Sequence, residues 1–197
     1  MTSERLKVGV ETQEQALLIL LNRCLEEGKI PDLWLNAEVI LLFKKGDCTN
    51  IENHGPISLF STFYKLSSKI ITNRLTQKFD FYKPIKQAGF RRGFSTIDHI
   101  QTVGTWIEYT EYNIPLHMAS VDYQKAVDSI ETWTVHRVMD NSRIDSRYSS
   151  LVQYIYEHAT LHVKLEEDWV TGRIPVRRGV WQGDTISPKF FTLALED

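Results

Sequence analysis

A short apolar run that ends on an acidic residue is the feature that most restricts what this chain can fold into. Residues 116–121 are largely apolar and are followed directly by Asp122. From Ala126 to Val138, apolar residues return at the spacing of a helix. This order predicts a buried strand that delivers a carboxylate at its carboxyl end and leads into a helix. Such a carboxylate suits metal binding, although an exposed aspartate at a strand end is the commoner case.

The rest of the chain alternates between helical and strand periodicity, which predicts an α+β or mixed α/β architecture. The predicted helices are residues 12–27, ended by Gly28, residues 61–79, a helix from Ser95, residues 148–156, and a helix from Ser187. The predicted strands are residues 33–43, which lead into a Gly46-Asp47 hairpin turn, and residues 161–165, which lead into a polar turn at 167–168.

Composition excludes several classes of protein. With 197 residues and 42% hydrophobic content, the chain can bury the core of one domain or of two small lobes. No apolar run reaches the roughly 18 residues of a membrane span, and the first residues lack a signal peptide's apolar stretch. The cysteines, Cys24 and Cys48, form no Cys-x-x-Cys pattern. We therefore expect an intracellular protein without a membrane partner.

Charge alone does not identify a partner. The formal net charge of -2 argues against a chain that binds nucleic acid over its whole surface. Lysines and arginines nevertheless cluster along residues 65–78, 83–92 and 173–178, where they form either a phosphate-binding surface or ordinary solvated faces. His158 and His162 are four residues apart, but His162 falls within a strand pattern, which disfavours a zinc site.

A glycine-rich segment precedes the last predicted helix. In residues 177–188, Gly179 and Gly183 flank Gln182. Glycines allow a backbone to approach a flat ligand such as a base or a sugar, which the Gln182 side chain can then meet. The alternative is an ordinary turn before a helix.

Several short blocks, taken in their order along the chain, carry a resemblance to a known family. The blocks are Ile30-Pro31-x-x-Trp34-x-x-Ala37, Leu42-Phe43-Lys44-Lys45-Gly46-Asp47, Asn53-x-x-Pro56-Ile57-Ser58-Leu59 with Tyr64-Lys65-Leu66, Gln87-Ala88-Gly89-Phe90-Arg91 with Ser95-Thr96-x-Asp98, Asp122-x-x-Lys125-Ala126-x-Asp128, and Arg178-Gly179-Val180-x-Gln182-Gly183-Asp184-x-x-Ser187-Pro188. From about residue 30 to residue 197, the chain resembles the reverse transcriptases of non-LTR (LINE-type) retrotransposons, which are endonuclease–reverse transcriptase polyproteins.

The resemblance implies a partial right-hand polymerase fold, with fingers and an incomplete palm in residues 30–197 and a helical lead-in segment in residues 1–29. It implies RNA-templated DNA synthesis, in which two Mg²⁺ ions hold an incoming dNTP for attack by a primer 3′-hydroxyl. The expected partners are an RNA template, a DNA primer and dNTP. Asp122 matches the first catalytic, metal-binding aspartate, and the Tyr123 backbone carbonyl matches an auxiliary ligand. The positions matching nucleotide or template contacts are Lys44, Arg91, Val127, Gln182 and Gly183, whereas Asp128 matches a structural position.

Departures from the family pattern predict that this chain is inactive alone. Gly55 replaces an arginine expected to reach the triphosphate, and Val127 replaces a phenylalanine that helps exclude ribonucleotides. We also expect the chain to end before the paired-aspartate hairpin and the thumb. The alternatives are a nucleic-acid-binding or interaction module derived from a decayed element, and a relic without a selected role.

Overall fold

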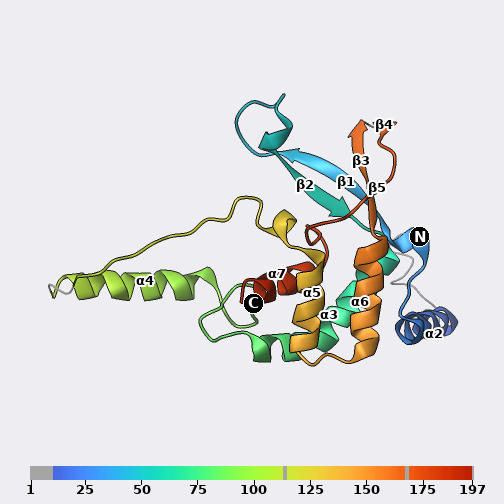
Figure 1. Cartoon of the computed structure of the whole chain (residues 1–197), viewed down its shortest axis with the longest axis horizontal. Coiled ribbons are helices and arrows are strands. Elements are labelled where there is room, and N and C mark those ends of the chain that lie inside the picture. Colours follow the sequence, from blue (N-terminus) through green and yellow to red (C-terminus); the bar gives the residue numbers. More distant parts are fainter. Residues whose placement is uncertain (1–10, 113–114, 167–168, 197) are drawn as a thin grey trace.

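The computed structural model describes residues 11–112, 115–166 and 169–196. Figure 1 shows a sheet on one side of the molecule, a group of helices packed below it, and one helix, α4, that extends away from both. None of the helices in the described ranges is both long and apolar enough to cross a membrane.

The sheet is mixed, because β1 pairs antiparallel with β2 and parallel with β3. The strand order β2-β1-β3-β4 leaves β2 at an edge, and β5 also pairs with β3. In the β1–β2 hairpin, Leu42 lies opposite Gly55 and Val39 lies opposite Ser58. The strands are β1 (Asn36–Phe43), β2 (His54–Leu59), β3 (Thr160–Glu166), β4 (Trp169–Val170) and β5 (Ile174–Pro175).

Apolar side chains from the helices and from β1 form one core. Phe79 and Phe190 are fully buried in it, with their ring centroids 5.8 Å apart. A second aromatic group links sheet and helices, because the Phe60 ring stacks on both Tyr64 and Trp181. The helices are α2 (Glu11–Glu27), α3 (Thr62–Tyr82), α4 (Thr96–Thr110), α5 (Thr132–Asn141), α6 (Ser146–His158) and α7 (Ser187–Ala194).

Most of the predicted elements are confirmed. The predicted helices at 12–27, 61–79, 95 onward, 148–156 and 187 onward correspond to α2, α3, α4, α6 and α7, and the predicted strands correspond to β1 and β3. Gly28 has φ +64 where α2 ends, as the left-handed cap of a helix requires. Asp98 accepts a hydrogen bond from the Ser95 backbone N–H, which fixes the start of α4. The predicted turn at residues 167–168 lies outside the described residues.

The predicted strand at residues 116–121 is wrong. This segment belongs to no strand, and Met118 and Val121 are 54% and 73% exposed. A strand forms only where a neighbour accepts its backbone hydrogen bonds, and β1 to β5 pair with one another instead. The predicted helix after Asp122 is also altered, because a short 3₁₀ turn (Val127–Ser129) comes first and α5 begins at Thr132.

Candidate functional site

Backbone hydrogen bonds join two of the sequence blocks that lie far apart in the chain. The Gly179 N–H donates to the Ile130 carbonyl at 2.7 Å, and the Val180 N–H donates to the Val127 carbonyl at 3.1 Å. The Arg178 side chain adds a bond to the Ser129 carbonyl. We call residues 127–131 and 178–183 together the seam. The seam fixes the segment that follows Asp122 against the glycine-rich segment.

Three of the predicted site residues lie in the seam. The side-chain amide of Gln182 donates to the Asp128 carboxylate at 3.2 Å. Val127 is half-buried, and its apolar side chain packs against the core. Gly183 follows Gln182 directly. The structure thus brings Val127, Gln182 and Gly183 together and places Asp128 beside them. The structural role expected of Asp128 stays a prediction.

The two glycines of the seam allow close contact with the chain's own backbone. A Cβ atom on Gly183 would lie 2.5 Å from the Ser58 carbonyl oxygen, and φ at Gly183 is +115. A Cβ atom on Gly179 would lie 3.0 Å from the Asp128 backbone. Both positions therefore require glycine for packing, whether or not a flat ligand also approaches.

Asp184, which follows this turn, is a buried carboxylate. It accepts hydrogen bonds from the Tyr64 hydroxyl at 2.9 Å and from the Ser68 hydroxyl. Burial raises the pKa of Asp184, and the bonds from Ser68 and Tyr64 and from the amides of Thr185 and Ile186 oppose that rise. Burial and the nearby Asp184 likewise raise the pKa of Tyr64. The turn is thereby tied to α3.

The residues predicted to bind metal directly follow residues 116–121, the segment that was expected to form a strand. Asp122 and Tyr123 are exposed, and Asp122 precedes the seam by five positions. Among the described residues, no group of three or more acidic, histidine or cysteine side chains is arranged to hold a metal ion. One carboxylate does not hold two metal ions, so the described residues do not by themselves fit the expected two-magnesium site.

Lys44 lies at the tip of the β1–β2 hairpin and folds over Gly55. A Cβ atom on Gly55 would meet the Lys44 side chain, with Nζ at 3.1 Å. The lysine therefore covers the position at which the family pattern has an arginine. Its side chain remains exposed. Its predicted contact with phosphate stays a prediction.

The Arg91 side chain bonds to backbone carbonyls that lie close to it in the sequence. Its guanidinium donates to the backbone carbonyls of Asp80, Lys83, Pro84 and Ile85. These carbonyls belong to the end of α3 and the turn after it, where helix carbonyls lack intrahelical partners. A phosphate contact by Arg91 would have to replace some of these bonds, so its predicted binding role remains a prediction.

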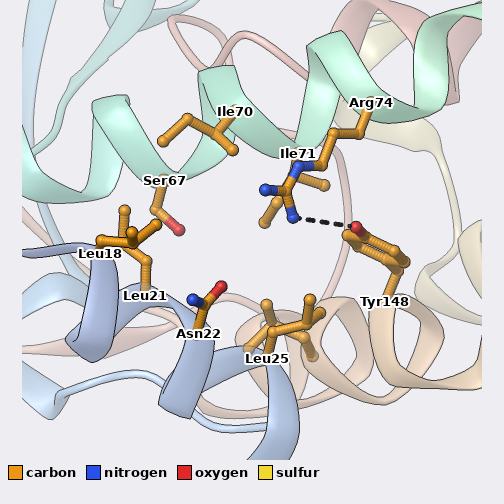
Figure 2. Close-up of a pocket in the computed structure, with 10 residues that line it drawn as sticks. Leu18, Leu21, Asn22, Leu25, Ser67, Ile70, Ile71, Arg74 and Tyr148 are labelled. Atoms are coloured by element: carbon orange, nitrogen blue, oxygen red, sulfur yellow. Dashed lines mark hydrogen bonds between the residues drawn. The ribbon is translucent and has the colours of Figure 1, made fainter.

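A cavity between α2, α3 and α6 offers a different kind of surface (Figure 2). Leucine and isoleucine side chains from α2 and α3 line most of it, and Arg74 donates to the Tyr148 hydroxyl at 3.2 Å on its rim. Its volume is about 50 Å³, which is room for one or two water molecules. None of the predicted site residues lines it.

Ser58, Tyr64 and Asp184 were missed as site residues by the sequence analysis. Tyr64 and Ser68 are four positions apart in a helix and so share one face, which was an available signal. Ser58 enters only through its backbone, which carries no sequence signal. The acid that both hydroxyls meet lies more than a hundred residues away, and its position follows from the fold alone.

Comparisons with known proteins agree with this architecture. A family profile described as "Reverse transcriptase (RNA-dependent DNA polymerase)" matches residues 43–197. The chain is 27% identical over 86% of its length to the Pol polyprotein of retrotransposable element R2 from Popillia japonica, 27% over 93% to the RNA-directed DNA polymerase of mobile element jockey from Drosophila melanogaster, and 26% over 90% to the transposon TX1 149 kDa protein from Xenopus laevis.

The chain spans only part of each of these relatives, namely 24%, 20% and 14% of their respective lengths. The matched profile covers well over half of the chain, from the tip of the β1–β2 hairpin through α7. The chain therefore belongs to the reverse transcriptase family, as a domain fragment of the non-LTR retrotransposon type.

Proposed function

We propose that this chain forms the fingers and part of the palm of an RNA-directed DNA polymerase, and that its seam faces the incoming nucleotide and the RNA template. The seam is the observation that carries the proposal. It holds Val127 and Gln182 together, and it rests on β2, whose hairpin carries Lys44. A rigid backbone platform beside a flexible cation suits positioning of a triphosphate and a base.

The proposed site includes Asp122 as one magnesium ligand, with the Tyr123 carbonyl beside it. When bound, two Mg²⁺ ions would supply charge neutralisation at the transferred phosphate. The described residues give this site one carboxylate, so we propose that residues 1–197 as an isolated polypeptide do not extend a primer. Incorporation of dNTP on an RNA template by that polypeptide would overturn this part of the proposal.

Photo-crosslinking tests the substrate-facing surface without requiring catalysis. A template RNA with 4-thiouridine opposite the primer terminus is annealed to a DNA primer and irradiated with the purified chain. We expect cross-linked peptides from residues 122–128 and 178–184. Cross-links confined to α2 and α6, neither of which contributes a residue to the seam, would contradict the proposal. The buried position Val135 provides a control peptide that should remain unlabelled.

The alternative, a nucleic-acid-binding module without polymerase chemistry, depends on the basic clusters. Arg91 and Arg178 already bond to backbone carbonyls or to Glu131. The alternative therefore rests more on Arg92 and Arg177, which are exposed. Salt-dependent RNA binding that is lost in the double variant Arg92→Ala/Arg177→Ala, without cross-links in the seam, would favour it.

A further inference from the structure

We infer that Asp184 is a positioning residue, whose buried carboxylate holds the Gln182–Gly183 turn against the free edge of β2. The carboxylate accepts bonds from Tyr64 and Ser68, which are both on α3. It lies immediately after the turn in sequence. The turn is thus fastened to a helix that is itself part of the core.

Because Asp184 is buried, the hydroxyls that bond to it require an acceptor with the shape of a carboxylate. Asp184 is only 6% exposed, and the side chains that contact it offer hydroxyl donors. The two oxygens of the carboxyl group can each accept a hydrogen bond, so one side chain satisfies the Tyr64 and Ser68 hydroxyls of α3 at once. A smaller apolar side chain would leave the Tyr64 and Ser68 hydroxyls buried without this partner, which is unfavourable. Asparagine keeps the shape and one acceptor oxygen.

The opposite side of the turn meets β2. The Ser58 N–H donates to the Gln182 carbonyl at 2.8 Å, outside the β1–β2 ladder. Gly183 lies against the Ser58 carbonyl. Since β2 is an edge strand, the turn occupies hydrogen-bonding groups that an edge would otherwise expose. Asp184 and Ser58 therefore hold the turn from two sides.

Aromatic side chains also hold the Gln182–Gly183 turn in place. Trp181, one residue before Gln182, is buried and stacks on Phe60 at 4.5 Å between ring centroids. Tyr64, the donor to Asp184, also stacks on Phe60. The hydrogen bond to Asp184 and the ring contacts therefore use the same residue of α3. The importance of the turn for substrates rests on the proposed function, but its attachment does not.

Amide hydrogen exchange at Ser58 tests the inference, because the Ser58 amide bonds to the Gln182 carbonyl and not to the Asp184 side chain. We expect Asp184→Ala to speed exchange of the Ser58 amide by at least about tenfold beyond any loss of global stability, because it leaves the buried Tyr64 and Ser68 hydroxyls without this acceptor. The neighbouring β2 amides that face β1 should keep their protection. Asp184→Asn should retain most of the Ser58 protection, which a requirement for charge alone would not allow.

Val135→Ala is the matched control, because it removes core packing in α5 and changes no hydrogen bond of the turn. In this variant, Ser58 exchange should rise only in proportion to global stability. The same proportional behaviour in Asp184→Ala would overturn the inference. If Asp184→Ala does not fold, Tyr64→Phe and Ser68→Ala each remove one donor and should each produce a smaller selective increase at Ser58. Unchanged Ser58 protection in both would also overturn it, whatever the cross-linking result for the proposed function.

Discussion

Gly183 lies against the backbone carbonyl of Ser58 so closely that a Cβ atom would stand 2.5 Å from the oxygen. The backbone of Gly183 also has φ +115, which side chains rarely allow. The contact joins the glycine-rich segment to β2. It gives this glycine a structural requirement that is independent of any ligand.

Gly183→Ala should therefore destabilise the fold by about 3 kcal/mol, from backbone strain and from displacement of β2. Chemical denaturation followed by circular dichroism measures this loss. Gly172→Ala is the matched control, since a Cβ atom there meets no atom within 4 Å. The control should change stability by less than about 0.5 kcal/mol. Equal stability of the two variants would contradict the close contact.

Arg91 provides a second prediction, because the resemblance and the structure suggest different roles for it. Arg91→Ala removes donors to carbonyls of residues 80 and 83–85, so we expect a loss of about 2 kcal/mol in unfolding free energy. Arg92→Ala, at an exposed neighbour, should cost less than about 0.5 kcal/mol. Urea denaturation of both variants decides the matter. An Arg91→Ala protein as stable as the parent would return Arg91 to a substrate-binding role.

The sequence correctly predicted those elements whose ends are fixed by residues nearby in the chain. The helix from Ser95 is fixed by its own Asp98, and α2 ends at Gly28 because of that residue's φ. The segment before Asp122 has a strand composition, but a strand also needs a neighbour, and composition does not specify one. Because the segment pairs with no strand, it is exposed in the structure.

The candidate site likewise has residues that the sequence identified and contacts that only the structure shows. The blocks identified Gln182 and Gly183 by residue type and spacing. Their actual neighbours, Asp128 and Ser58, lie 54 positions away or more, and only the three-dimensional structure reveals them. The role of Asp184 was equally hidden, because an acidic residue in a turn is usually exposed, whereas this one is buried under α3.

Lys83 leads to a pH prediction. Its side chain is fully buried near Asp80, and burial, followed by the charge of Lys189, lowers the pKa of Lys83 to about 8. Between about pH 8 and the ordinary value of 10.5, the unfolded chain binds this proton and the folded chain does not. The cost of the buried cation is therefore fully present below pH 8. The contribution of Lys83 should raise stability as the pH increases across this window.

Lys83→Met should remove that pH dependence and stabilise the protein at pH 7 by about 1–2 kcal/mol, since it relieves the buried charge. Thermal unfolding between pH 7 and 10.5 measures both effects. Lys189→Met is the control, because Lys189 bonds Asp80 at 2.8 Å and its removal should destabilise the fold. Destabilisation by Lys83→Met at pH 7 would show that the ammonium group is needed for its contact with the Gly89 carbonyl.

The last prediction concerns α4, which has no buried residue although its sequence is amphipathic. Ile100 and Ile107 are 68% and 54% exposed, and Figure 1 shows the helix extending away from the other elements. Replacing both with lysine should change unfolding free energy by less than about 0.5 kcal/mol, because little burial is lost. The exposed apolar surface should favour self-association, so sedimentation velocity should show less of it in the variant. Leu151→Lys, in the core, is the destabilising control. A marked loss of stability from the α4 substitutions would mean that this helix packs against the rest of the chain in solution.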